Sequence, residues 1–171
     1  MSLIQGTTIE SVLEEFLFAP IRYPEFLPTL LPIILGAVVI ELYFGKHKSE
    51  NLGWNTAVGN AIIWTTTGIT LLITSDPTGS ARYAAYFLIL IGGFIGYMNF
   101  FHKWSAEIAF FISSAGIIYS LAYVTVVVVK TGMTVDETVL KASAVFIIGV
   151  NIVFKIIQAF QRPAQDEIGF S

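Results

Sequence analysis

The sequence contains no cysteine and few charged residues, and both shortages exclude classes of protein. Among its 171 residues there is no cysteine, which excludes disulfides, thiolate metal sites and thiol nucleophiles. Charged residues make up 12% of the chain, about half the share that is usual in soluble domains. The formal net charge is −3, so there is no excess of basic residues to neutralise a phosphate backbone. We therefore expect no nucleic acid as a partner.

The residue patterns of common catalytic and metal sites are also missing. The two histidines, His47 and His102, are far apart and form no H-x-x-x-H pair, so neither a zinc nor a di-iron site of familiar form is expected. No serine lies in a G-x-S-x-G turn, which is the usual setting of a nucleophilic serine in hydrolases. The three aspartates fall in predicted loops or tails, at Asp76, Asp136 and Asp166. We expect no cofactor and no metal ion, and the sequence argues against an enzyme without excluding one.

Apolar residues, in contrast, are abundant and grouped. They make up 55% of the chain, and the mean hydropathy is +0.75. They form about five stretches, each close to the ~20 residues that an α-helix needs to cross a bilayer. The expected spans are residues 28–44, 56–74, 83–101, 106–129 and 135–161. The predicted fold is all-α, with residues 24–161 forming one polytopic bundle of about five transmembrane helices in the lipid bilayer.

Short segments are expected on either side of this bundle. Within residues 1–23, apolar residues recur at helical spacing from Ile9 to Leu17, which predicts an amphipathic helix at the membrane interface. Thr7 followed by Glu10 has the pattern of a capping box at its start. The polar side of this helix is acidic, which favours packing on the protein's own spans or on a partner over binding to anionic lipid. Residues 162–171 form a short polar tail.

Turn residues mark the ends of several spans. Pro32 lies far enough inside the first span to kink it. The segment Asp76–Gly79 predicts a turn after the second span, and Gly132 suits a left-handed cap at the end of the fourth. Thr134 and Glu137 have the pattern of a second capping box, which would open the fifth span.

Most polar residues inside the spans belong to the side of the membrane on which the C-terminus lies. This candidate polar cluster contains Glu41, Asn60, Asn99, Glu107, Asn151, Lys155 and Gln158. In the fifth span, Asn151, Lys155 and Gln158 are spaced four and three residues apart, so they form one stripe. Charged groups in a membrane normally find a partner or reach the interface, and Glu41 is the carboxylate nearest to Lys155 in depth.

Two interpretations of the cluster remain open. In the first, Glu41 and Lys155 form an ion-responsive pair in a gated polar cavity. In the second, Lys155 reaches the lipid headgroups while the asparagines hold helices together. The sequence favours the second interpretation.

Small residues predict where the helices approach one another. Gly92 and Gly96 form a G-x-x-x-G pattern in the third span, and the fourth span carries a stripe made of Ala109, Ser113, Gly116 and Ser120. Small side chains permit close contact between helix backbones in lipid. We expect these two faces to join spans three and four into a hairpin, with homo-oligomer formation through the same faces as the alternative.

Orientation and function are less strongly indicated. The nine basic residues divide four to five between the two sides, which weakly favours a cell-membrane protein with its N-terminus outside and its C-terminus in the cytoplasm. One expected function is that of a structural or accessory subunit that packs against itself or a larger membrane complex. The alternative is a small transporter or channel, with a cavity lined by Glu41, Asn60, Asn99, Asn151 and Lys155. The absence of an internal repeat favours the accessory role.

Overall fold

The computed structural model describes residues 8–46 and 53–161, and within these ranges the chain is helical and contains no strand. Five regions of this described part of the chain are long and apolar enough to cross a membrane, which confirms the predicted all-α bundle. The helices are α1 (Ile9–Arg22), α2 (Leu27–Lys46), α3 (Trp54–Ser75), α4 (Gly79–Phe100), α5 (Ala106–Ile112), α6 (Ala115–Thr131) and α7 (Glu137–Phe160), with a 3-10 turn at Pro24–Phe26 between α1 and α2.

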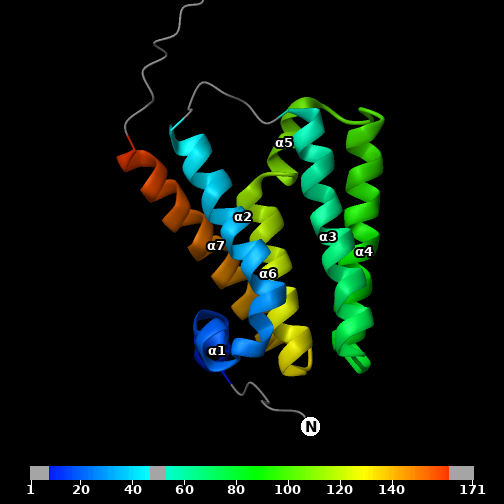
Figure 1. Ribbon diagram of the computed structural model, residues 1–171, viewed down its shortest axis with the longest axis vertical. Helices are drawn as coiled ribbons and strands as arrows, with labels where there is room; N and C mark the ends of the chain where they lie inside the picture. Colours follow the sequence, from blue (N-terminus) through cyan, green and yellow to red (C-terminus); the bar gives the residue numbers. More distant parts are fainter. Residues whose placement is uncertain (1–7, 47–52, 162–171) are drawn as a thin grey trace, which may run out of the picture.

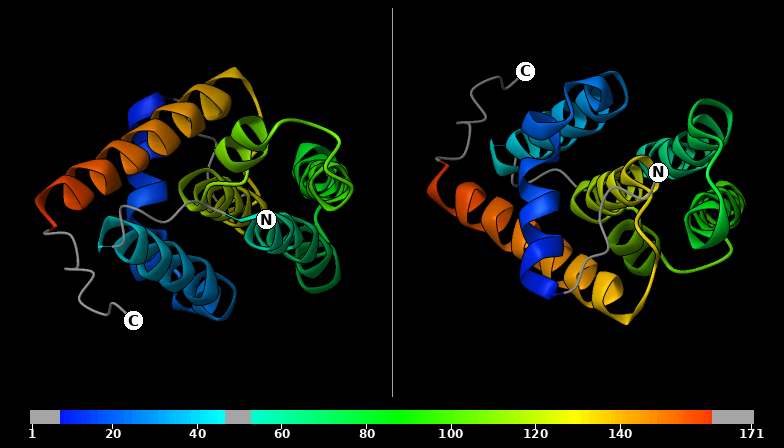
Figure 2. Two further views of the ribbon diagram at one scale, coloured as in Figure 1. Left: turned by 90° about the horizontal axis from the view of Figure 1, so that it is seen from above. Right: turned by 90° about the horizontal axis from the view of Figure 1, so that it is seen from below.

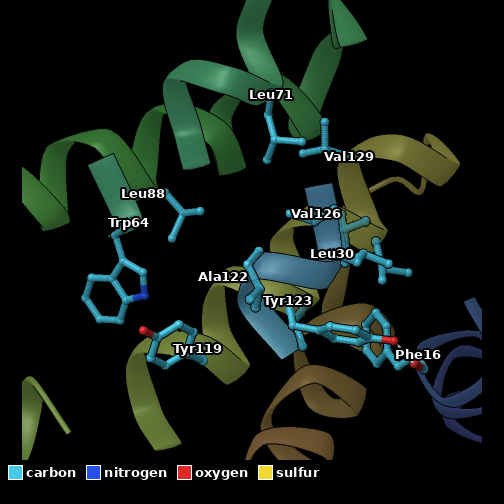
Figure 3. Packing of buried hydrophobic residues seen from close by; sticks show 14 of the residues in the cluster. Phe16, Leu30, Trp64, Leu71, Leu88, Tyr119, Ala122, Tyr123, Val126 and Val129 are labelled. Carbon is cyan, nitrogen blue, oxygen red and sulfur yellow. Dashed lines mark hydrogen bonds between the residues drawn. The ribbon is translucent and has the colours of Figure 1, made fainter. Parts of the chain in front are cut away.

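Helix α6 lies at the centre of the bundle. It packs against α2 and α7 on one side and against the α3–α4 hairpin on the other (Figure 1, Figure 2). In the most apolar part of the fourth candidate span 78% of the residues are buried, against 6% in that of α7. The small side chain of Ala122 on α6 lies between side chains from α3 and α4 and those from α2 (Figure 3). Helix α6 therefore contacts both halves of the bundle, the α2–α7 side and the α3–α4 hairpin.

The fourth span is not the continuous helix that its hydropathy predicts. It is divided into α5 and α6 at Ser113 and Ser114. Ser114 has extended backbone angles, with φ −61° and ψ 145°, at the N-cap of α6. Serine hydroxyls compete with helical backbone hydrogen bonds, so two consecutive serines make a break less costly than it would be in an aliphatic run. The break was not predicted, because averaging hydropathy over a span hides two serines among apolar residues.

Helices α3 and α4 form the closest-packed pair (Figure 1). A Cβ at Gly92 of α4 would lie 2.8 Å from the backbone nitrogen of Thr65 and 2.9 Å from the carbonyl oxygen of Ala61. At Gly96 a Cβ would meet only the Ala61 side chain, at 3.6 Å. The predicted close approach at the G-x-x-x-G is present, but its partner is the second span, α3. The expectation that this face joins spans three and four was wrong.

The turn between α3 and α4 is the one that the sequence predicts. Asp76 and Gly79 both have positive φ, at 37° and 55°. Nη2 of Arg82 lies 2.9 Å from Oδ1 of Asp76, and its Nε donates to the carbonyl of Pro77 at 2.7 Å. On the same side, the backbone N–H of Val135 donates to the Ser80 hydroxyl at 2.8 Å, which ties the α6–α7 connection to the start of α4.

Helix caps follow the predicted chemistry but not always the predicted residues. Gly132 ends α6 with φ 70°, as expected. The N-cap of α7 is Asp136, whose Oδ1 accepts from the Val139 N–H at 2.8 Å, so the predicted Thr134–Glu137 box was wrong. Asp136 immediately precedes the helix, which puts its short carboxylate within reach of the third N–H. Helix α1 is capped by Thr8, whose reciprocal partner is Ser11 and not Glu10; Thr7 lies outside the described residues.

Helix α1 lies at one end of the bundle (Figure 1) and runs across it (Figure 2), beside α7 and the end of α6. Phe16 is fully buried, and its ring lies 5.4 Å from that of Phe146. The hydroxyl of Tyr123 on α6 donates to the Phe16 carbonyl at 2.7 Å. Glu15 is also buried and accepts from Arg22 at 2.8 Å. Hydrogen bonds to Glu14 and Glu15 raise the pKa of the Arg22 guanidinium. Two acidic side chains of α1, Glu14 and Glu15, therefore form ion pairs within the protein.

Candidate functional site

Two groups of polar side chains meet the break between α5 and α6 from opposite sides. The first comes from α3 and α4. Nδ2 of Asn60 donates to the Ser113 carbonyl at 2.7 Å, and Nδ2 of Asn99 donates to the Ser113 hydroxyl at 2.8 Å. Nε1 of Trp104 completes this group by donating to Oδ1 of Asn99 at 2.7 Å. A helix break leaves backbone groups without helical partners, and Asn60 supplies a donor to one of them, the Ser113 carbonyl, while Asn99 holds the Ser113 side chain.

The second group lies where α6 begins. Nδ2 of Asn151 on α7 donates to the Gly116 carbonyl at 3.2 Å and to the Ile147 carbonyl at 2.8 Å. A Cβ at Gly116 would lie 2.0 Å from Oδ1 of Asn151 and 3.2 Å from Oε1 of Glu41. A larger residue here would displace the Asn151 side chain, because side-chain oxygens from two different helices converge on the Gly116 backbone.

Glu41 occupies the space between α2, α6 and α7. Its relative exposure is 9%, and its carboxylate faces the Gly116 backbone in the first turn of α6. Nε2 of Gln158 donates to Oε2 of Glu41 at 2.6 Å and to the Glu41 carbonyl at 3.2 Å. The position suits a carboxylate, since the N-terminal turn of a helix carries partial positive charge.

Lys155 reaches Glu41 through Gln158. Its Nζ donates to Oε1 of Gln158 at 3.2 Å, while the amide nitrogen of the same Gln158 holds the carboxylate. The two charges are therefore linked by one amide, and the ion pairs recorded among the described residues do not include a direct Glu41–Lys155 contact. The predicted stripe on α7 does face protein along Asn151 and Gln158, although Lys155 itself is exposed.

The remaining predicted residues are distributed differently. Glu107 is exposed at the start of α5 and joins neither polar group. The small-residue stripe of the fourth span is divided by the break: Ser113 meets α3 and α4, whereas Gly116 meets α2 and α7. Ala109 is buried in α5, and Ser120 bonds back to the Gly116 carbonyl. A continuous helix would have placed these residues on one face. Because the helix breaks between Ser113 and Gly116, the residues before and after the break face different helices.

Two residues of the site were not identified as members from the sequence. Ser113 was expected only to pack, and Trp104 was not among the predicted site residues, yet both hydrogen-bond within the Asn99 group. Trp54 stacks on His102 with ring centroids 4.1 Å apart. The feature of the sequence that could have indicated the break is the Ser113–Ser114 pair inside an apolar span. Serine hydroxyls compete for the backbone hydrogen bonds of a continuous helix.

Several cavities border α6 within the described residues. An apolar pocket of about 150 Å³ lies between α2, α6 and α7, and a cleft of about 380 Å³ separates α2 from α3. A wider groove of about 730 Å³ runs between α7 and the α5–α6 break. Within residues 8–46 and 53–161, no three histidine or acidic side chains gather closely enough to hold a metal ion.

Comparison with known proteins adds no relative: no protein-family model, no curated protein and no solved structure matches this chain.

Proposed function

We propose that the protein is a small transporter that moves a cation or proton, alone or together with a polar solute, past the break in its fourth span. Interrupted helices in membrane proteins expose backbone groups at depth, and transporters use such groups to bind ions and substrates. The break here lies in the central span, which contacts both halves of the bundle. This supports transport over the purely accessory role that the sequence favours.

One observation carries the proposal. Oε1 of Glu41 and Oδ1 of Asn151 converge on Gly116 in the first turn of α6. A carboxylate and an amide oxygen are hard ligands of the kind that alkali and alkaline-earth cations prefer, so both can ligate a cation there, and the Glu41 carboxylate can instead take up a proton. Gain or loss of that charge would change the attraction between Glu41 and the N-terminal turn of α6.

A cleft lies on the side of α6 that faces α3. The cleft between α2 and α3 is lined by Pro32, Thr66, Thr67 and Tyr119, among others. Pro32 has no N–H, so the Pro28 carbonyl lacks its helical donor. Tyr119 follows Gly116 by three residues on α6, which is about one helical turn. Along α6, the cleft therefore reaches to within about one turn of Gly116, where Glu41 and Asn151 converge.

The test is cation or proton flux in liposomes that contain the purified protein. Sodium, potassium and proton gradients are imposed in turn, with ion-sensitive dyes trapped inside. We expect flux through the wild type and its loss in Glu41→Gln and Asn151→Leu. Glu107→Gln is the matched control, because it removes an exposed carboxylate from the same end of the bundle. Flux no greater than in empty liposomes for all three ions, or full flux in Glu41→Gln, would refute the proposal.

A membrane location is suggested by composition, and we propose a cell membrane with the N-terminus outside. The chain has no cysteine, so single cysteines can be labelled without background. With this orientation, Asp76→Cys reacts with an impermeant thiol reagent in intact cells, and Ser105→Cys reacts only after lysis. The reverse pattern would invert the topology.

An accessory role is the second proposal, and it is supported by α7. Only Val139 and Ala142 of this helix are buried, which leaves a long apolar surface for lipid or for another membrane protein. Purification from mild detergent distinguishes the two roles. A stoichiometric membrane partner together with absent flux would favour the accessory role.

A further inference from the structure

The groove between α7 and the α5–α6 break changes in polarity along its length. Most of its lining is apolar, including Ile156 and Ala159 nearer the end of α7 than Lys155. Its polar groups are Lys155 toward that end and Asn151 and Ser114 at mid-length, and the deeper part at Ile117 and Ile148 is aliphatic. It holds about 730 Å³. A charge above neutral polar groups, all within an apolar groove, matches the phosphate, glycerol ester and acyl chain of a phospholipid.

The depth of Lys155 also matches a lipid headgroup. Lys155 lies five residues before the end of α7 at Phe160, or about 8 Å along the helix axis. Ile148 lies seven residues further from that end, about 10 Å deeper. A lysine at this level lies near the interface, where anionic headgroups are found.

The polar groups of the groove retain capacity to bind a ligand. The Lys155 ammonium has three donors and gives one hydrogen bond, to Gln158. Ser114 is the N-cap of α6, but its hydroxyl does not cap that helix. Glu41, the carboxylate behind Gln158, is buried on the bundle side, so the positive charge of Lys155 is the one presented to the groove.

The groove is open toward the surroundings of the bundle. Phe111 at its edge is 71% exposed, and Ile148 is 60% exposed. In a membrane these surfaces face lipid, so an occupant can enter laterally from the bilayer. We propose that this groove binds one anionic glycerophospholipid, with the phosphate at Lys155 and one acyl chain along Ile148. The groove shares Asn151 with the proposed cation site, but lipid binding is measured without flux, so either proposal can fail while the other stands.

The first experiment measures lipid selectivity by native mass spectrometry of the full chain in detergent. Dioleoylphosphatidylglycerol is compared with dioleoylphosphatidylcholine. We expect the anionic lipid to bind about fivefold more tightly, the factor typical of one lysine near a membrane surface. Lys155→Gln should lose this preference, and Lys155→Arg should retain it. Lys141→Gln is the control, because Lys141 is exposed on the same helix but paired with Glu137 at the other end. An unchanged preference in Lys155→Gln would overturn the inference.

The second experiment separates a lipid site from a simple anion site. Glycerol 3-phosphate carries the headgroup charge without acyl chains, and we expect it not to displace phosphatidylglycerol at millimolar concentration. A phosphatidylglycerol with a diazirine near the end of one acyl chain should crosslink to the peptide that contains Ile147 and Ile148. Displacement by glycerol 3-phosphate, or crosslinking confined to other helices, would refute the lipid site.

Discussion

The side-chain amide of Asn60 donates a 2.7 Å hydrogen bond to the backbone carbonyl of Ser113, which lies 53 residues further along the chain. Ser113 caps the end of α5, where helical bonding stops. In an apolar setting an unpaired carbonyl is costly, so this bond offsets part of the cost of interrupting the fourth span. The break is therefore supported by α3 and is part of the packed structure.

Replacing Asn60 tests this support. Asn60→Leu removes the donor and leaves the Ser113 carbonyl buried without it, so we expect the free energy of unfolding to fall by about 1 to 2 kcal/mol. Thermal or denaturant unfolding in detergent measures the change. Thr66→Val on the same helix is the control, because the exposed Thr66 hydroxyl bonds only to its own preceding turn. Equal losses in both variants would mean that the Asn60 bond adds nothing.

The glycines of α4 provide a matched pair. In Gly92→Ala the new Cβ would meet the α3 backbone at 2.8 and 2.9 Å, so α3 and α4 must separate, and we expect a loss of about 1 to 3 kcal/mol. At the adjacent Gly93 a Cβ meets nothing within 4 Å. Gly93→Ala should be neutral or stabilise by up to about 1 kcal/mol, because alanine favours helix. Thermal or denaturant unfolding in detergent measures both changes in stability. Similar effects at the two positions would contradict the observed packing.

The amide link between Glu41 and Lys155 predicts an order of coupling energies. A double-mutant cycle of Glu41→Gln with Gln158→Leu should show an interaction energy of about 0.5 to 3 kcal/mol, as for other contacting pairs. The cycle of Glu41→Gln with Lys155→Met should show a smaller one, because Gln158 lies between the two charges. A larger coupling energy for Glu41 with Lys155 than with Gln158 would instead support a direct Glu41–Lys155 ion pair, the first of the two interpretations that the sequence left open.

The hydroxyl of Tyr123 anchors α1. Tyr123→Phe removes its bond to the Phe16 carbonyl while keeping the ring stacked on Phe146. We expect a loss of about 1 kcal/mol and faster amide hydrogen exchange along α1. Tyr86→Phe on the exposed face of α4 is the control and should leave α1 unchanged. If Tyr123→Phe also leaves exchange in α1 unchanged, the hydroxyl does not hold this helix.

Several features were predictable because they depend on local sequence. Span length follows from runs of apolar residues, and the polar stripe on α7 follows from the spacing of Asn151 and Gln158. The left-handed cap at Gly132 was predictable for the same reason, since glycine allows that conformation almost without cost. The capping of α7 was misassigned by two residues, because Thr134 and Asp136 are both suitable cap residues and only the backbone decides between them.

The sequence by itself determined that this chain forms about five apolar helices, and it determined the approximate depth of each polar group. Both follow from hydropathy and from the rise of a helix. Only the tertiary structure decided that the fourth span breaks at Ser113, that Gly92 packs on α3, and that Gln158 lies between Glu41 and Lys155. The physical reason is that spacing along a helix fixes a face and a depth, whereas the rotation of one helix against another depends on the packing of all of them.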